Sequence, residues 1–148
     1  MNFDNLYDTK CVYKIQNKDI PVLKSYFTKK SGWVYIATSK NNSSLKIGRT
    51  GKNPMERAKT LSSAGVLHDF DIIFSLKVFN QFWVEKTIHQ KLKKFRITSN
   101  KEFFSISESL AIETFHNSYN EENNLLKRFF NIDILRDDIE LIEYSLIK

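Results

Sequence analysis

The stretch between residues 33 and 48 constrains the fold of this chain more than any other. Residues 33–38 form a compact run of aromatic and β-branched side chains, which favour strands. The polar segment 40–44 follows, and residues 45–48 form a second short run ending in glycine. Two such runs separated by a polar turn are typical of a hairpin. We therefore expect two neighbouring antiparallel strands here.

The sequence after this hairpin predicts a helix, a strand and a second helix. Residues 53–56 are Asn-Pro-Met-Glu, which combine a capping residue, a proline in the first turn and a glutamate three residues after the cap. A helix should run from there to about Ser63. Partial alternation at 70–79 predicts a third strand. Apolar residues at helical spacing over 81–95 predict an amphipathic helix. The expected fold is α+β, a small three-stranded antiparallel sheet flanked by helices.

The two ends of the chain differ from this central part. Residues 1–30 contain short apolar runs without a sustained period, so we expect an irregular or weakly helical lead-in. After the central domain, residues 31–106, a helix capped by Ser107 should begin a helical C-terminal extension, residues 107–148, that continues as an acidic, helix-like tail from about residue 120 to the end. A length of 148 residues suits one domain with such additions.

Charge is distributed unevenly along the chain. The net charge is +3 over residues 1–30, +9 over residues 31–101 and −6 over residues 102–148. A basic segment favours a polyanionic partner, because Lys and Arg side chains that neutralise phosphates release counterions. A solvated charged surface without a partner is the alternative on charge alone.

Cysteine content and hydropathy exclude several other classes. The single cysteine, Cys11, can build neither a disulfide framework nor a cysteine-rich metal site, and it suits a reducing compartment. No apolar run approaches the roughly 20 residues of a membrane helix, and the N-terminus lacks the pattern of a signal peptide. We expect a protein that is not secreted, has no membrane partner, and lies in the cytoplasm, in a nucleoid or in a viral factory within the cell.

Five short motifs occur in the order strand, strand, helix, helix and a closing apolar step. They are Gly-Trp-Val-Tyr-Ile at 32–36, Leu-Lys-Ile-Gly-Arg-Thr at 45–50, Asn-Pro-Met-Glu-Arg at 53–57, Glu-Lys-Thr-Ile-His at 85–89 and Lys-Glu-Phe-Phe at 101–104. Together they resemble the GIY-YIG nuclease superfamily, in the branch with Lys-Ile-Gly in the second motif that is widespread in phages and large DNA viruses. The resemblance covers about residues 32–105.

This resemblance implies a metal-dependent endonuclease that hydrolyses phosphodiester bonds of DNA. It implies that Tyr35 is the general base and that Lys46 and Arg57 hold the scissile phosphate. Glu85 would be the single protein ligand of a Mg²⁺ or Mn²⁺ ion. His89, one helical turn later, would contact phosphate or orient a water molecule. Without the motifs, each of these residues has a plainer interpretation in packing or solvation.

Other residues receive weaker assignments. Glu102 either belongs to the site or simply braces the sheet. Four basic residues of the central segment are predicted to contact nucleic acid: Arg49, Lys52, Lys93 and Lys94.

Two other functions remain open at this stage. One is a noncatalytic nucleic-acid-binding module with the same fold and basic surface. The other is a toxin-like or regulatory protein whose acidic tail binds a protein partner or the basic domain. A homodimer is also open, because one active site cuts one strand per encounter.

Overall fold

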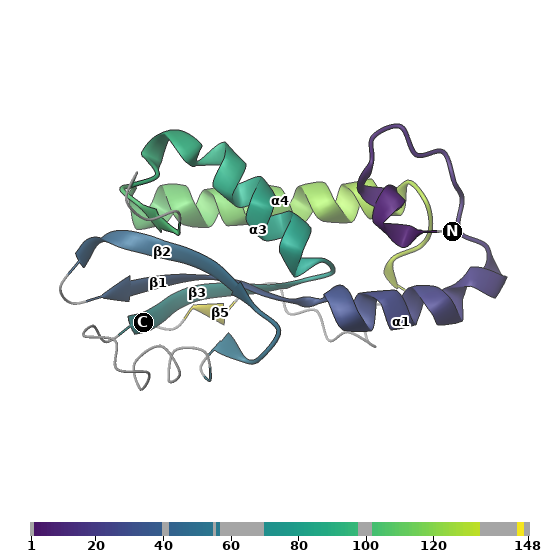
Figure 1. Ribbon diagram of the computed structural model, residues 1–148, viewed down its shortest axis with the longest axis horizontal. Helices are drawn as coiled ribbons and strands as arrows, with labels where there is room; N and C mark the ends of the chain where they lie inside the picture. The colour runs from purple at the N-terminus through teal and green to yellow at the C-terminus, as the bar shows by residue number, and fades with distance from the viewer. Residues whose placement is uncertain are drawn as a thin grey trace.

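The computed structural model describes residues 2–39, 42–54, 56, 70–97, 102–133 and 145–146. In chain order its elements are η1 (Phe3–Tyr7), η2 (Asn17–Asp19), α1 (Ile20–Lys30), β1 (Gly32–Ser39), β2 (Asn42–Thr50), β3 (Phe70–Val78), α3 (Gln81–Lys91), η3 (Lys93–Phe95), β4 (Phe103–Phe104), α4 (Glu108–Lys127) and β5 (Ser145–Leu146). Figure 1 shows α3 and α4 layered over the sheet. The predicted α+β class, with an antiparallel sheet and a helix C-terminal to it, is confirmed.

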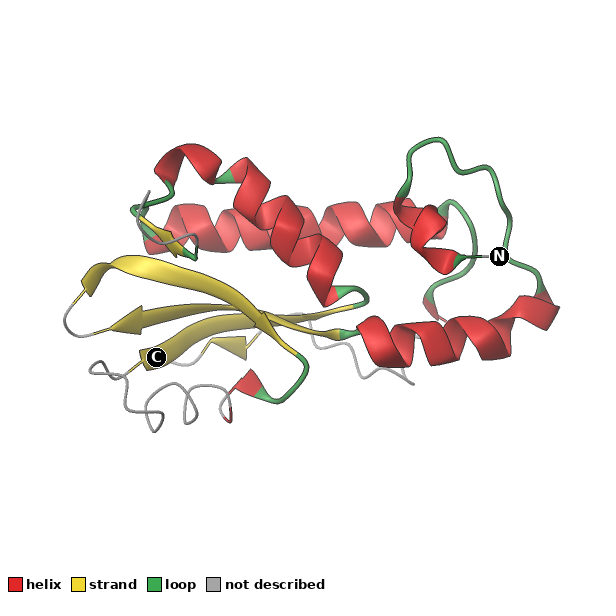
Figure 2. Ribbon diagram, viewed as in Figure 1, coloured by secondary structure: helices red, strands yellow, loops and turns green. Residues whose placement is uncertain are grey.

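The sheet is antiparallel, with the strand order β4-β2-β1-β3-β5 (Figure 2). Its centre consists of the three predicted strands, and β1 pairs with β2 on one side and β3 on the other. The two-residue strands β4 and β5 extend this sheet beyond the prediction. The pairing of Ser145 with Ser75 also corrects the expectation of a helix-like tail up to Ile147.

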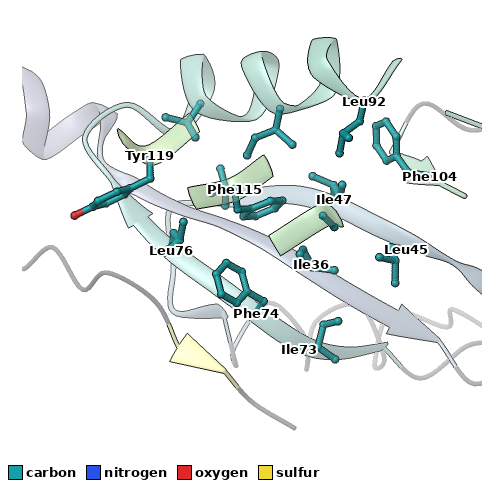
Figure 3. Packing of buried hydrophobic residues seen from close by; sticks show 14 of the residues in the cluster. Ile36, Leu45, Ile47, Ile73, Phe74, Leu76, Leu92, Phe104, Phe115 and Tyr119 are labelled. Atoms are coloured by element: carbon teal, nitrogen blue, oxygen red, sulfur yellow. The ribbon is translucent and has the colours of Figure 1, made fainter. Parts of the chain in front are cut away.

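The main hydrophobic core lies between one face of the sheet and the two helices α3 and α4 (Figure 3). Strand residues such as Ile36 and Ile47 meet Phe115 of α4 in this layer. The predicted stripe of α3 is buried here, because Val84, Ile88 and Leu92 all point into it. Each fully buried side chain of this size stabilises the fold by about 1.5–3 kcal/mol. The core therefore fixes α3 against the sheet.

A second core cluster joins the N-terminal segment to the end of α4. Its buried members are Phe3, Leu6, Leu23, Phe27, Phe79, Leu126, Phe129 and Ile132. Within the lead-in that was expected to be irregular or weakly helical, residues 20–30 form the helix α1. Tertiary packing decides this helix, since its two buried residues contact segments distant in the sequence.

Glu122 of α4 connects three parts of the fold. Its carboxylate accepts hydrogen bonds from the Tyr7 hydroxyl at 2.8 Å and from the backbone N–H groups of Phe79 and Asn80 at 2.9 Å each. Asn80 is the N-cap of α3, and its side chain accepts from the N–H groups of the first turn. Burial raises the pKa of Glu122 to about 7. This buried carboxyl group therefore fixes the turn from which α3 begins.

The predicted helix after the hairpin lies mostly outside the described residues. Pro54 and Glu56 are helical, and the Glu56 N–H donates to the Asn53 carbonyl at 3.0 Å, as expected at a helix start. Among the described residues, no helix is both long and apolar enough to cross a membrane.

Candidate active site

The predicted catalytic residues that the structure describes lie on β2, on its neighbour β1 and on α3, which contacts β2. Strand β4 pairs with Leu45 and Lys46 of β2, and the Ile47 N–H donates to the Glu102 carbonyl at 2.9 Å. Beyond this point, the described part of the chain contains no strand paired with residues 48–50 on that side. Helix α3 contacts β2 from the face that forms the core. Strand β4 and helix α3 are thus both neighbours of β2.

Tyr35 is held tightly on the opposite face of the sheet from the main core. Its neighbours Val34 and Ile36 point into that core, so alternation directs Tyr35 the other way. There it packs with Ala37 and Ile72, and only 1% of it is exposed. This packing fixes the position of the phenol ring.

Gly48 is paired with Tyr35 across the two strands. A Cβ atom at residue 48 would lie 2.7 Å from the Tyr35 hydroxyl oxygen. The ring therefore crosses the backbone at a point where a side chain would obstruct it. The glycine of the Lys-Ile-Gly motif is explained by this close approach.

Lys46 is buried and its ammonium forms an ion pair with the Glu102 carboxylate. The same ammonium lies 5.5 Å from the centre of the Phe103 ring. Half of the Glu102 side chain is exposed. Glu102 therefore braces the sheet edge through both its backbone and its side chain, and it neutralises the cation that was predicted to hold phosphate.

Glu85 lies on α3 with 19% of its side chain exposed. Its cationic neighbour is Arg49 of β2, whose Nε lies 3.7 Å from the Glu85 carboxylate. Desolvation raises the pKa of Glu85; Arg49 and Lys46 oppose this shift, whereas the negative charge of Glu102 adds to it. Arg49 and Lys46 only partly offset the cost of burying this carboxylate, so an additional cation would stabilise its ionised form.

His89 is anchored to the sheet one turn after Glu85. Its Nε2 lies 2.9 Å from the Ile47 carbonyl oxygen, and its ring centre is 5.1 Å from that of Phe104. Burial lowers the pKa of His89, which favours the neutral ring. Since a carbonyl only accepts, the neutral ring carries its proton on Nε2. Nδ1 is then the nitrogen with a lone pair for another contact.

The remaining predicted residues have different positions. Arg57 lies outside the described residues. Lys52 is exposed just after β2, and its backbone N–H donates to the Thr50 hydroxyl at 3.1 Å. Lys93 and Lys94 are exposed in η3, past the end of α3. Of the four predicted nucleic-acid contacts, Arg49 is the one that forms an ion pair with Glu85.

The donor set was tested against the expected metal. Within the part of the chain that the structure describes, no group of three or more His, Cys, Asp or Glu residues is arranged to hold an ion. A zinc site would need such a group. Mg²⁺ instead keeps several waters and takes one or two carboxylates together with phosphate oxygens. Glu85, a partly buried hard oxygen ligand, fits this second pattern.

Two further residues, at the start of α3 and at the end of α1, were not identified from the sequence. Phe82 is exposed on the first turn of α3, and Lys30 ends α1; the Lys30 ammonium lies 5.3 Å from the Phe82 ring centre. A signal for Phe82 was available, because it is an aromatic residue that falls outside the apolar stripe of its helix. No local pattern indicates that Lys30 reaches this ring.

The fold and the site define an α+β protein with two acidic–basic pairs, Lys46–Glu102 and Arg49–Glu85, along β2. The sequence model of the T5orf172 domain matches residues 32–119, more than half of the chain, and the chain belongs to this family. The assignment to the GIY-YIG superfamily is therefore wrong. Its motifs were short and built from residue types common in strands and helices, and the matched region extends past residue 105 into α4.

One viral protein is similar over much of the chain. Uncharacterized protein 460R of Invertebrate iridescent virus 6 is 33% identical over 110 residues, which are 72% of this chain and 45% of the viral protein. The chain thus spans less than half the length of this relative. No solved structure matches. The T5orf172 domain is a nuclease-like domain associated with nucleic acids, and the relative is viral.

Proposed function

We propose that the chain is a divalent-metal-dependent endonuclease that hydrolyses phosphodiester bonds of DNA. The observation that carries this proposal is that the Arg49–Glu85 and Lys46–Glu102 pairs lie along β2. Cutting a phosphodiester requires an activated water, a clamp for the developing charge and help for the leaving oxygen. The residues of this candidate site can meet these needs.

Each residue has a role in this proposal. Tyr35 accepts the proton of the attacking water. Lys46 and Arg57 hold the nonbridging oxygens of the scissile phosphate. When the phosphate enters, it competes with Glu102 for the Lys46 ammonium. His89 uses its Nδ1 to position a water or a phosphate group, while its Nε2 stays bonded to Ile47.

Glu85 would hold Mg²⁺ or Mn²⁺, and the bound ion would stabilise the charge that develops on the phosphate. Two features of this side chain support the assignment. Its partial burial makes it costly to leave the carboxylate without a counter-charge, and Arg49 approaches only to 3.7 Å. The Glu102 carboxylate nearby increases the demand for a cation.

A cleavage assay tests the proposed function. The protein is incubated with single-stranded, duplex and branched DNA, and with RNA of the same sequences, in Mg²⁺, in Mn²⁺ or in EDTA. We expect DNA to be cut in the two metal ions and to stay intact in EDTA. Salt-sensitive binding without cutting in any condition would favour the noncatalytic binding module. Neither binding nor cutting would favour the interaction protein.

A further inference from the structure

An exposed aromatic ring lies beside the candidate active site. Three large hydrophobic side chains are exposed among the described residues, and Phe82, at 44%, is the aromatic one. It precedes Glu85 by three positions on α3, which places both residues on adjoining parts of one helix surface. This ring belongs to none of the hydrophobic core clusters among the described residues.

Two cations from separate elements face this ring. The guanidinium carbon of Arg49 in β2 lies 4.1 Å from the Phe82 ring centre, and the ammonium of Lys30 at the end of α1 lies 5.3 Å from it. Segments widely separated in the sequence thus bring two positive charges to one exposed aromatic ring. We call Lys30, Arg49 and Phe82 the stacking surface.

This combination suits an unpaired nucleotide. A base stacks on aromatic rings and on the plane of an arginine guanidinium, and lysine and arginine neutralise the phosphates on either side. A base within a continuous duplex cannot reach such a surface, because its faces are covered by its neighbours. The surface is therefore selective for strands in which a base is free.

Arg49 sets the position of this surface relative to the proposed chemistry. It contacts both the Phe82 ring and the Glu85 carboxylate. A nucleotide on the stacking surface would therefore have its phosphate within reach of Glu85.

We propose that Phe82, Arg49 and Lys30 bind an unpaired nucleotide next to the phosphodiester that is cut, so that the preferred substrate is single-stranded or branched DNA. The location of the cut rests on the proposed function. Binding of the unpaired nucleotide does not, because it can be measured without metal.

The test uses the full chain in EDTA, where no cutting occurs. The probe is a DNA oligonucleotide with one 5-iodouracil, either single-stranded or within a duplex, because this base crosslinks under light to aromatic side chains that stack on it. We expect the single-stranded probe to crosslink to Phe82, identified by mass spectrometry of the peptides, and to bind more tightly than the duplex.

Variants separate stacking from general attraction. Phe82→Ala should weaken binding of the single strand by about tenfold and remove the crosslink, and Phe82→Leu should do the same although it retains apolar bulk. Lys30→Gln should weaken binding and reduce its salt dependence by about one counterion. Val12→Ala, a change at an exposed apolar residue, is the matched control and should bind as the unchanged protein does.

Two results would overturn the proposal: a Phe82→Ala variant that binds and crosslinks like the unchanged protein, or equal affinity for the duplex and the single strand. A failure of the nuclease proposal would give a different result. If no metal ion supports cutting but the crosslink to Phe82 forms, binding of an unpaired nucleotide is supported and the endonuclease activity is contradicted.

Discussion

The hydroxyl of Tyr35 lies so close over Gly48 that a Cβ at residue 48 would come within 2.7 Å of it. The two residues are paired across β1 and β2, so the register of the hairpin itself puts the phenol over the glycine. The proposed general base is thus positioned by a neighbouring strand that lacks a side chain at this point.

Gly48→Ala should displace the Tyr35 ring, because the added methyl group and the hydroxyl cannot occupy the same space. We expect a loss of stability of about 1–3 kcal/mol, typical of overpacking, and a larger relative loss of cleavage. Gly51→Ala is the matched control, since its Cβ would meet Gln81 only at 3.5 Å, an ordinary contact. Urea unfolding and cleavage rates measure both effects. Equal cleavage by the two variants would contradict the role of the Tyr35 position.

Lys46→Met tests whether Lys46 acts on the substrate or only braces the sheet. Removing one partner of an ion pair is costly when it leaves the other charge buried, but half of the Glu102 side chain is exposed and stays hydrated after the change. We therefore expect an unfolding free energy within about 1 kcal/mol of the original and cleavage slower by about 10²-fold. Lys77→Met, at a strand lysine that lies 4.7 Å from the Trp33 ring, is the control and should keep its activity. A stability loss that accounts for the whole decrease in activity would make Lys46 structural.

The buried carboxyl of Glu122 should make stability depend on pH. Its pKa is raised from 4.5, its ordinary value, to about 7 in the folded chain. Between these values the folded state binds a proton that the unfolded state has lost, so stability falls as pH rises through this window. The expected loss is up to about 3 kcal/mol. Glu122→Gln cannot titrate and should flatten this slope in urea unfolding at a series of pH values. An unchanged slope would show that Glu122 is not the group responsible.

Cleavage should fall as pH decreases, because a protonated Glu85 cannot bind a metal ion. Since the pKa of Glu85 is raised by desolvation, this fall should begin above the ordinary range of a glutamate. Protons and metal ions compete for the same carboxylate, so more Mg²⁺ should move the midpoint to lower pH. Rates across pH at several Mg²⁺ concentrations measure this. A midpoint of the pH–rate curve that does not change with the Mg²⁺ concentration would argue against Glu85 as the ligand.

The local sequence pattern was sufficient to predict the three long strands and α3, but not β4, β5 and α1. The three long strands were predicted from aromatic and β-branched runs and from partial alternation, and α3 from apolar residues at helical spacing. Strands β4 and β5 are two residues each, too short for any period, and exist through pairing with β2 and β3. Helix α1 was missed because Leu23 and Phe27 are buried by Phe79 and Leu126, which lie far along the chain.

In the candidate site, contacts within one helix were predictable from the sequence, whereas contacts between distant segments were not. Glu85 and His89 were predicted as neighbours because four residues make about one helical turn. The ion pair of Lys46 with Glu102 joins residues 56 positions apart, and the contact of Lys30 with Phe82 likewise depends on the tertiary fold. The family could not be fixed from short motifs either, and the match to the T5orf172 domain replaced the first assignment.

The most direct measurement of the central claim compares Glu85→Gln with the unchanged protein on one labelled DNA substrate. Glutamine preserves the shape of the side chain and removes the charge that would hold the metal. In Mg²⁺ we predict cleavage slower by about 10²-fold or more, while DNA binding in EDTA is at least as strong as before. Undiminished cleavage by Glu85→Gln in Mg²⁺ would contradict the account.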